Sequence, residues 1–121
     1  MFITKEYLLS HPNCIFVFGD NLVRKGKGGA ALLRDCPNTY GFITKKFPNN
    51  DDNSFYRPDE YRDVFNREIR KLTVCIVNGP SKEFLISQLG SGLANKYKIW
   101  EEIIEKGIAG LKKYPNVKFL F

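Results

Sequence analysis

The sequence predicts an α/β domain, because segments typical of strands alternate along the chain with segments typical of helices. Three observations carry this prediction: a continuous apolar run at residues 15–18, apolar residues at helical spacing after Pro58, and the closing run "NVKFLF" at 116–121. A chain of 121 residues is long enough for one core of ordinary size. We therefore expect a single domain over residues 1–121.

The first half of the chain predicts two strands joined by a helix. The apolar run Ile15 to Phe18 is typical of a strand buried on both faces. Residues 28–35 predict a helix that packs through small and aliphatic side chains and that Pro37 ends. The β-branched and aromatic residues at 40–44 predict a second strand. The following "KKFPNNDDNS" has the composition of a loop.

The second half predicts two helices and two strands. Pro58 followed by two acidic residues is typical of a helix start, and helical spacing continues to Ile76, before "VNGP". A strand over residues 73–77 is the alternative, because that run is rich in β-branched residues. Residues 84–89 predict a strand leading into "GSG", residues 97–111 an amphipathic helix, and "NVKFLF" a last strand.

Composition and charge narrow the class of protein. The 43% hydrophobic and 14% aromatic content indicates a folded protein, and no apolar run is long enough to span a membrane. The amino-terminal residues lack the apolar centre of a signal peptide, so we expect a cytoplasmic protein. The net charge of +6 favours an acidic partner, either nucleic acid or a phosphorylated small molecule.

Cysteine and histidine content argues against two kinds of site. The three cysteines form no CxxC pair, so we expect reduced, mostly buried thiols. His11 is the only histidine, and His11 with Cys14 is at most half of a zinc site. A single histidine also disfavours Ser-His-Asp chemistry. We therefore expect neither a metal nor a cofactor.

A glycine-rich stretch follows the first strand, in "FVFGDNLVRKGKGGAALLRD" at 16–35. Glycines at 26, 28 and 29 expose backbone amides, which bind anions with the help of a helix start. The stretch fits neither common phosphate-binding pattern: a phosphate loop needs glycine where Asn21 stands, and a dinucleotide fingerprint needs glycine where Ala31 stands. The alternative is an ordinary turn with solvated lysines.

A second glycine-rich turn, "LGSGLANKY" at 89–97, follows another predicted strand. Two such loops at one edge of a sheet face each other across a crevice, where open α/β sheets bind ligands. Lys45 follows the strand at 40–44, so it can reach over the same edge to neutralise a phosphate or act as a nucleophile. Two loops of bare backbone suit a diphosphate, and the ligand expected is a nucleotide.

The order of these pieces resembles the macro domain, the fold that binds ADP-ribose. The likeness extends over residues 2–121 and is carried by "FVFGDNL" with "GKGGAALL", then "ITKK", the Pro-capped helix, "GSGL" and Trp100. It is strongest to the branch that contains terminal ADP-ribose protein glycohydrolase and to short phage and bacterial macro-like proteins. The resemblance implies a three-layer fold, a mixed sheet flanked by helices, smaller than a full macro domain.

The resemblance also implies roles for individual residues. Asp20 and Asn21, with the loop 26–30, would lie against the distal ribose and diphosphate, and residues 91–94 would hold the diphosphate from the other side. Lys45 matches the lysine that attacks the anomeric carbon in the glycohydrolase. The nucleotide-binding candidates are Asp20, Asn21, Gly26, Lys27, Gly28, Gly29, Ala30, Gly90, Ser91, Gly92, Leu93, Ala94, Asn95 and Tyr97, and the catalytic candidates are Lys45 and Asp20.

Two departures from the family pattern decide between functions. Ala94 stands where the glycohydrolase has its acidic residue, which leaves Asp20 as the substitute partner for Lys45. The aspartate that contacts adenine in the family is missing, and Glu6 is the nearest candidate. Binding of ADP-ribose or a related NAD-derived nucleotide, cyclic signalling forms included, is therefore the first expectation, with sequestration of a defence signal in a phage setting as its role.

Two other functions stay open. The first alternative is hydrolysis by Lys45, which would remove ADP-ribose from an ADP-ribosylated protein or nucleic acid. The second is a basic nucleic-acid binder whose aromatic residues Phe42, Phe47, Phe55 and Tyr56, near Arg57, stack on bases. No membrane partner is expected, and the sequence leaves the oligomeric state open.

Overall fold

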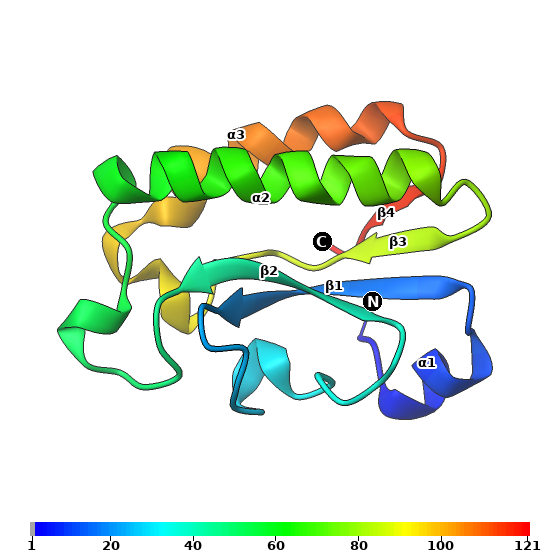
Figure 1. The fold of residues 1–121 in the computed structure, drawn as a ribbon, viewed down its shortest axis with the longest axis horizontal. Coiled ribbons are helices and arrows are strands. Elements are labelled where there is room, and N and C mark those ends of the chain that lie inside the picture. The colour runs from blue at the N-terminus through cyan, green and yellow to red at the C-terminus, as the bar shows by residue number, and fades with distance from the viewer. Residues whose placement is uncertain (1) are drawn as a thin grey trace.

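The computed structural model describes residues 2–121 and contains one four-stranded sheet with the strand order β2-β1-β3-β4 (Figure 1). The strands are β1 (Cys14–Asn21), β2 (Thr39–Lys45), β3 (Glu83–Ile86) and β4 (Val117–Phe119). This confirms the α/β class. Each pairing between these strands is parallel, so the expectation of a mixed sheet is wrong. The reason is that every connection between strands crosses over the sheet and returns to the same end.

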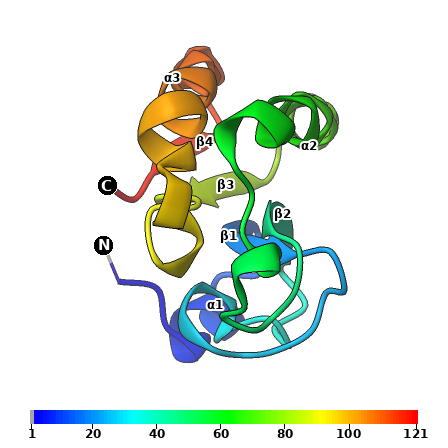
Figure 2. The same ribbon diagram turned by 90° about the vertical axis from the view of Figure 1, so that its left-hand side faces the viewer.

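Helical segments cover both faces of the sheet (Figures 1 and 2). One face carries α2 (Pro58–Asn78) and, beside it, the continuous run η4 (Trp100–Ile104), α3 (Glu105–Ile108) and η5 (Ala109–Lys113). The opposite face carries α1 (Lys5–Ser10) and the 3₁₀ turn η1 (Gly29–Ala31). Two further 3₁₀ turns, η2 (Asp52–Ser54) and η3 (Leu93–Tyr97), lie in connecting loops.

A hydrophobic core lies on each face because strand side chains alternate between faces. Val17 and Ile86 belong to the larger core with α2 and α3, and both are fully buried. Leu85 belongs to the smaller core with Leu8 of α1. Both faces of β1 and β3 are therefore covered, as the apolar runs in these strands predict.

Two helical expectations in the first half need correction. The helix predicted over residues 28–35 is only the three-residue η1, followed by turns. Gly29 has φ +52, outside the helical range, and Pro37 limits the length from the other end. In addition, α1 forms in a segment for which no element is predicted, and Thr4 caps it by accepting a hydrogen bond from the amide of Tyr7.

The second half agrees more closely with the predicted elements. α2 runs without interruption to Asn78, which excludes the alternative strand at 73–77. The strand predicted at 84–89 ends at Ile86. The helix predicted at 97–111 begins only after Lys98, because Lys98 has φ +66 and separates η3 from the helical run that follows.

The outer edge of β2 is covered by side chains from other parts of the chain. The Ile43 amide donates to Glu68 at 2.7 Å, and the Tyr61 hydroxyl donates to the Ile43 carbonyl at 2.5 Å. Arg24 donates to the Gly41 carbonyl at 2.7 Å. Beyond these, Lys45 forms an antiparallel bridge with Phe55. The Gly41 carbonyl, both backbone groups of Ile43 and the end of this edge strand at Lys45 therefore have partners within the chain.

The cysteines, the candidate metal ligands and the helices can be compared with the expectations from composition. Cys14 and Cys36 are buried and Cys75 is exposed, and all three are free thiols. Within residues 2–121, no three histidine, cysteine or acidic side chains are placed to hold a metal ion. None of the helices in this range combines the length and the apolar character needed to cross a bilayer.

We predict that two glycines of the last helical run respond oppositely to alanine. In Gly107→Ala the new Cβ would lie 2.3 Å from the ring of the buried Phe65, so overpacking should lower the free energy of unfolding by about 1–3 kcal/mol. At Gly110 a Cβ meets no atom within 4 Å, so Gly110→Ala should leave stability unchanged or raise it by up to about 1 kcal/mol. Urea unfolding of both variants measures the difference, and equal effects would contradict the packing seen at Phe65.

Candidate functional site

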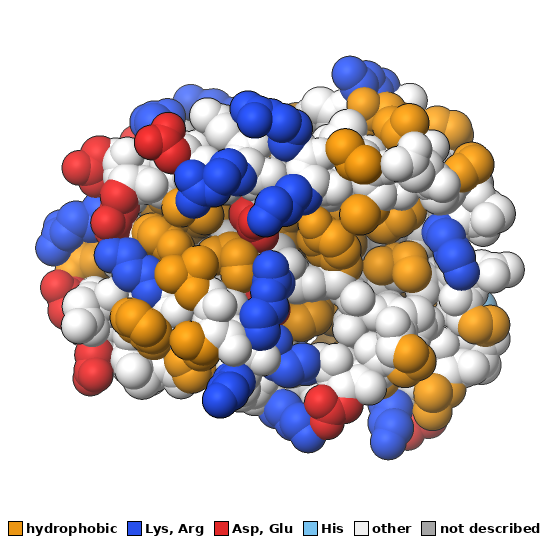
Figure 3. Space-filling view, in the orientation of Figure 1, with side chains coloured by type: hydrophobic (Ala, Val, Ile, Leu, Met, Phe, Trp, Pro, Cys, Tyr) orange, Lys and Arg blue, Asp and Glu red, His pale blue; other side chains and the backbone are white. Residues whose placement is uncertain are grey.

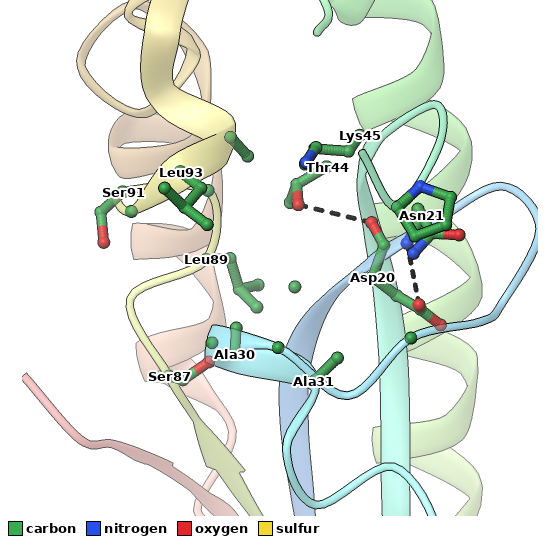
Figure 4. A pocket seen from close by; sticks show the side chains of 18 of the residues that line it. Asp20, Asn21, Ala30, Ala31, Thr44, Lys45, Ser87, Leu89, Ser91 and Leu93 are labelled. Atoms are coloured by element: carbon green, nitrogen blue, oxygen red, sulfur yellow. Dashed lines mark hydrogen bonds between the residues drawn. The ribbon is translucent and has the colours of Figure 1, made fainter. Parts of the chain in front are cut away.

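A cavity of about 520 Å³ opens at the carboxyl ends of β1, β2 and β3 (Figure 4). β1 connects to β2 on one side and pairs with β3 on the other, so this is the point where the strand order reverses. Loops leaving neighbouring strands at such a point diverge to opposite faces and leave a crevice between them. The parallel topology therefore creates the cavity, and its volume lies within the range of small-molecule sites.

Both glycine-rich loops line this one cavity. Of the sequence-predicted residues, the cavity is lined by Asp20, Asn21, Gly26, Gly28, Gly29, Ala30, Lys45, Gly90, Ser91, Gly92, Leu93 and Ala94. In Figure 4, Lys45 and Thr44 lie across from Ser91 and Leu93, with Ala30 and Ala31 along another wall. Loops more than sixty positions apart in sequence thus form two sides of one cavity.

Three predicted residues lie outside the cavity lining. Lys27 forms a surface ion pair with Asp35. The Asn95 side chain accepts from the Trp100 amide at 3.0 Å and donates to Glu101, so it organises the start of η4. The Tyr97 hydroxyl donates to Asp52, and the Arg57 guanidinium lies over the Tyr97 ring. Their expected role as ligand contacts is not supported by these positions.

The loops present backbone amides without partners. None of residues 2–121 accepts a hydrogen bond from the amides of Gly26, Gly28, Gly90 or Gly92. The amides at the start of the 3₁₀ turn η1 likewise have no acceptor inside the turn. Because η1 spans three residues, the expected contribution of a helix dipole is small, and the loop amides themselves are the donors for an anion.

Asp20 holds the first loop in place through Arg34. Its carboxylate is buried and accepts from Arg34 at 2.6 Å, from Arg24 at 3.0 Å and from the Asn21 amide at 2.8 Å. Arg34 then donates onward to the carbonyls of Gly26 and Lys25, at 2.8 and 3.1 Å. Asp20 is thus committed to two guanidinium groups, which removes it as the acid–base partner expected for Lys45.

Asn21 holds the same loop from within. Its side-chain amide donates to the Lys25 carbonyl at 2.8 Å, and its side-chain oxygen accepts from the Val23 amide at 3.1 Å. Together with the Arg34 contacts, these bonds fix residues 21–26 before any ligand arrives. A preorganised loop binds without first losing conformational entropy.

Lys45 reaches the cavity from the end of β2. Its ammonium group donates to the Asn49 carbonyl at 2.8 Å and lies 5.0 Å from the centre of the Phe55 ring. Burial lowers the pKa of Lys45 below its usual value, because desolvation disfavours the charged form. An anion in the cavity would restore the lost stabilisation of that charge.

The second loop is shaped by packing and by one glycine conformation. Gly90 has φ +73, and a Cβ there would lie 2.7 Å from the Ile104 side chain, so only glycine fits this turn. Ser91 closes the turn, since both its amide and its hydroxyl donate to the Gln88 carbonyl. Packing against Ile104 and the bonds from Ser91 therefore hold the turn, and Gly90 and Gly92 bring no side chain to the cavity.

The electrostatics of the lining favour an anionic ligand. Lys25 and Lys45 supply positive charge, and Asp20 is the one acidic residue that lines the cavity among the described residues. Two arginines already compensate the Asp20 carboxylate. Glycines, alanines and serines make up much of the remaining lining, which suits a ligand with phosphate groups that approach the backbone closely.

Sequence reasoning missed part of this lining. Thr44, Ser87, Gln88, Leu89, Lys25 and residues 48–50 also line the cavity. Thr44 and the loop after Lys45 had a signal, because they adjoin a predicted site residue at a strand end. Gln88 had none, since a single glutamine after a strand does not indicate a site.

The aromatic residues considered for stacking on nucleic-acid bases are mostly part of the core. Phe42, Phe55 and Tyr56 are buried, and of this set only Phe47 is substantially exposed. Basic side chains are spread over the face seen in Figure 3 and do not form one stripe. Buried rings do not stack on bases, so these positions do not favour the nucleic-acid interpretation.

We predict a large stability difference between two aspartate variants near the first loop. Asp20→Ala leaves two guanidinium groups without their buried acceptor and should cost roughly 3–5 kcal/mol of unfolding free energy. Asp35→Ala removes only the exposed pair with Lys27 and should change stability by less than about 1 kcal/mol. Denaturant titration of both variants measures the two unfolding free energies. A loss below about 1 kcal/mol in Asp20→Ala would show that the Asp20 contacts with Arg24 and Arg34 are dispensable.

Comparison with known proteins gives one match. A family model described as "Family of unknown function (DUF7831)" matches residues 1–95. No curated protein and no solved structure matches the chain. The matched range contains the first glycine-rich loop, residues 89–95 of the second, the three strands that form the cavity and Lys45. The chain therefore belongs to this family of unknown function.

Proposed function

We propose that this protein binds ADP-ribose or a related NAD-derived nucleotide, cyclic forms included, in the cavity between its two glycine-rich loops. The observation that carries the proposal is that both loops line the same cavity at the carboxyl end of a parallel sheet. In this proposal the fold is a reduced relative of the macro domain, with four parallel strands and helical segments on both faces.

The diphosphate is the part of the ligand that the loops fit best. The unpaired amides at Gly28 and Gly92 come from opposite sides of the cavity, so they can donate to the two phosphates of one ligand. Lys45 supplies a charge to the same space. Charge-assisted hydrogen bonds from fixed donors are the strong kind, which supports tight capture of a doubly charged group.

Capture is favoured over cleavage as the outcome of binding. Hydrolysis is the second candidate, because Lys45 lines the cavity and burial lowers its pKa, as a nucleophilic lysine requires. A lysine nucleophile also needs a group to move protons at the leaving oxygen. Asp20 is held by Arg24 and Arg34, and position 94 is alanine. The ligand is therefore expected to leave unchanged, as in a protein that sequesters a signalling nucleotide of a phage defence system.

We predict that filling the first loop abolishes binding without unfolding the protein. Gly28 has φ −83 and ψ 149, which any residue adopts, and a Cβ there meets no atom within 4 Å. Gly28→Leu should therefore lower ADP-ribose affinity about hundredfold or more while the melting temperature changes little. Gly110→Leu is the matched control, since its Cβ also enters open space but far from the cavity lining. Isothermal calorimetry that finds equal affinities in both variants would refute this site.

We predict that Lys45→Met weakens binding by about 1.5–3 kcal/mol, or roughly ten- to hundredfold, because a charged hydrogen bond to phosphate is lost. Lys27→Met changes the net charge equally outside the cavity and should have little effect. A bound phosphate raises the lowered pKa of Lys45. Wild-type affinity should therefore be complete below the free-protein pKa, fall as pH rises through it, and level off above the bound-state pKa. Lys45→Met should lose this alkaline dependence.

The same variant separates capture from cleavage. Wild-type protein incubated with ADP-ribosylated protein or nucleic acid should release no ADP-ribose, as followed by mass spectrometry. Release by wild type that disappears in Lys45→Met would replace capture with hydrolysis as the function.

A further inference from the structure

A second cavity adjoins the first. It has a volume of about 290 Å³ and shares four lining residues with the first cavity, namely Gly29, Ala30, Ser87 and Gln88. The start of η1 and the segment after β3 therefore form a common border between the two spaces. A ligand that extends over this border would occupy both.

The two cavities differ in chemistry. The first is lined by lysines and bare amides, whereas no charged side chain of the described residues lines the second. Phe2, Leu32 and Phe121 line the second cavity although they are 85%, 64% and 55% exposed, and Phe16 lies among them. Large apolar side chains gathered around an open hollow are typical of a surface that a ligand covers. A flat, uncharged ring system has the shape and polarity to do so.

Gln88 is the polar side chain best placed to read such a ring. Of the two polar side chains in the second lining, the Ser87 hydroxyl already donates to the Val17 carbonyl at 2.7 Å. The Gln88 carbonyl accepts from Ser91, but no residue from 2 to 121 forms a hydrogen bond with its side-chain amide. That amide has both a donor and an acceptor end, and rotation of the amide exchanges them.

We propose that the second cavity holds the purine base of the nucleotide, and that Gln88 is a specificity-determining residue that accepts both 6-amino and 6-oxo purines. The proposal rests on the proposed function, since the diphosphate places the base. A carboxylate at this border would accept from a 6-amino group and repel a 6-oxo group. Glu6, the carboxylate that the sequence offered for base recognition, lines neither cavity. Gln88 can donate to one group or accept from the other, so the site tolerates both.

The test compares ADP with IDP, two probes that differ in the substituent at position 6 of the base. Calorimetry of the wild type should give affinities that agree within about threefold. In Gln88→Glu the side chain only accepts, so the ratio should shift about fivefold or more toward ADP. In Gln88→Lys it only donates, and the ratio should shift by a similar factor toward IDP. Because each ratio is taken within one variant, effects of the new charge on the diphosphate cancel.

Each outcome has a separate meaning. Opposite shifts in the two variants, with neither shift in Gly110→Leu, support the assignment. A wild type that prefers one nucleotide by more than about tenfold, or ratios that stay unchanged in both variants, overturns the role of Gln88 and leaves nucleotide binding intact. If the wild type binds inorganic pyrophosphate as tightly as ADP, the base lies outside the second cavity. If it binds ADP-ribose, ADP and IDP not at all, the proposed function fails and this inference fails with it.

Discussion

The buried carboxylate of Asp20 is the constraint on which the candidate site depends. An ionised group that folding removes from water must be compensated, and here two arginines and one backbone amide do so. Arg34 also donates to the carbonyls of Lys25 and Gly26. In the same loop, the amides of Gly26 and Gly28 have no acceptor among residues 2–121. The Asp20 carboxylate is thus a structural group. Because it must be compensated when buried, it holds Arg34 in place, and Arg34 in turn holds one conformation of the loop.

The alternation of strands and helices is predictable from the sequence. The extent of η1 and the existence of α1 are not. Buried strands such as β1 and the long α2 have strong local signals: a continuous apolar run, and Pro58 with acidic residues before a helical repeat. The segment at 28–35 had a helical composition, but Gly29 adopts a left-handed conformation that composition does not reveal. The short α1 depends on a Thr4 cap and on packing of Leu8 against the sheet. The parallel direction of every strand likewise follows from the crossovers and not from any residue pattern.

In the candidate site too, some features are predictable from the sequence and others are not. Bare loops after strands are a property of local sequence, so the residues at 26–30 and 90–94 were predictable, and the topology brings them to one cavity. Partners of individual side chains depend on tertiary contacts. The sequence offers Asp20 as a catalytic candidate and Tyr97 as a ligand contact, because it does not reveal that Arg34, fourteen residues away, binds the first and that Asp52, in another loop, binds the second. Sequence therefore predicts where backbone is exposed better than it predicts which side chains remain free.

The side chains that cover the outer edge of β2 affect whether a second chain can add a strand there. Unpaired strand edges recruit strands from other chains, both in aggregation and in peptide recognition. At Gly41, Ile43 and Lys45 those positions are occupied by Arg24, by Glu68 and Tyr61, and by Phe55. An incoming strand would have to displace the buried Glu68 carboxylate and the buried Tyr61 hydroxyl before it paired with Ile43. Addition of a strand from a second copy beside Ile43 and Lys45 would therefore break contacts that the fold itself uses.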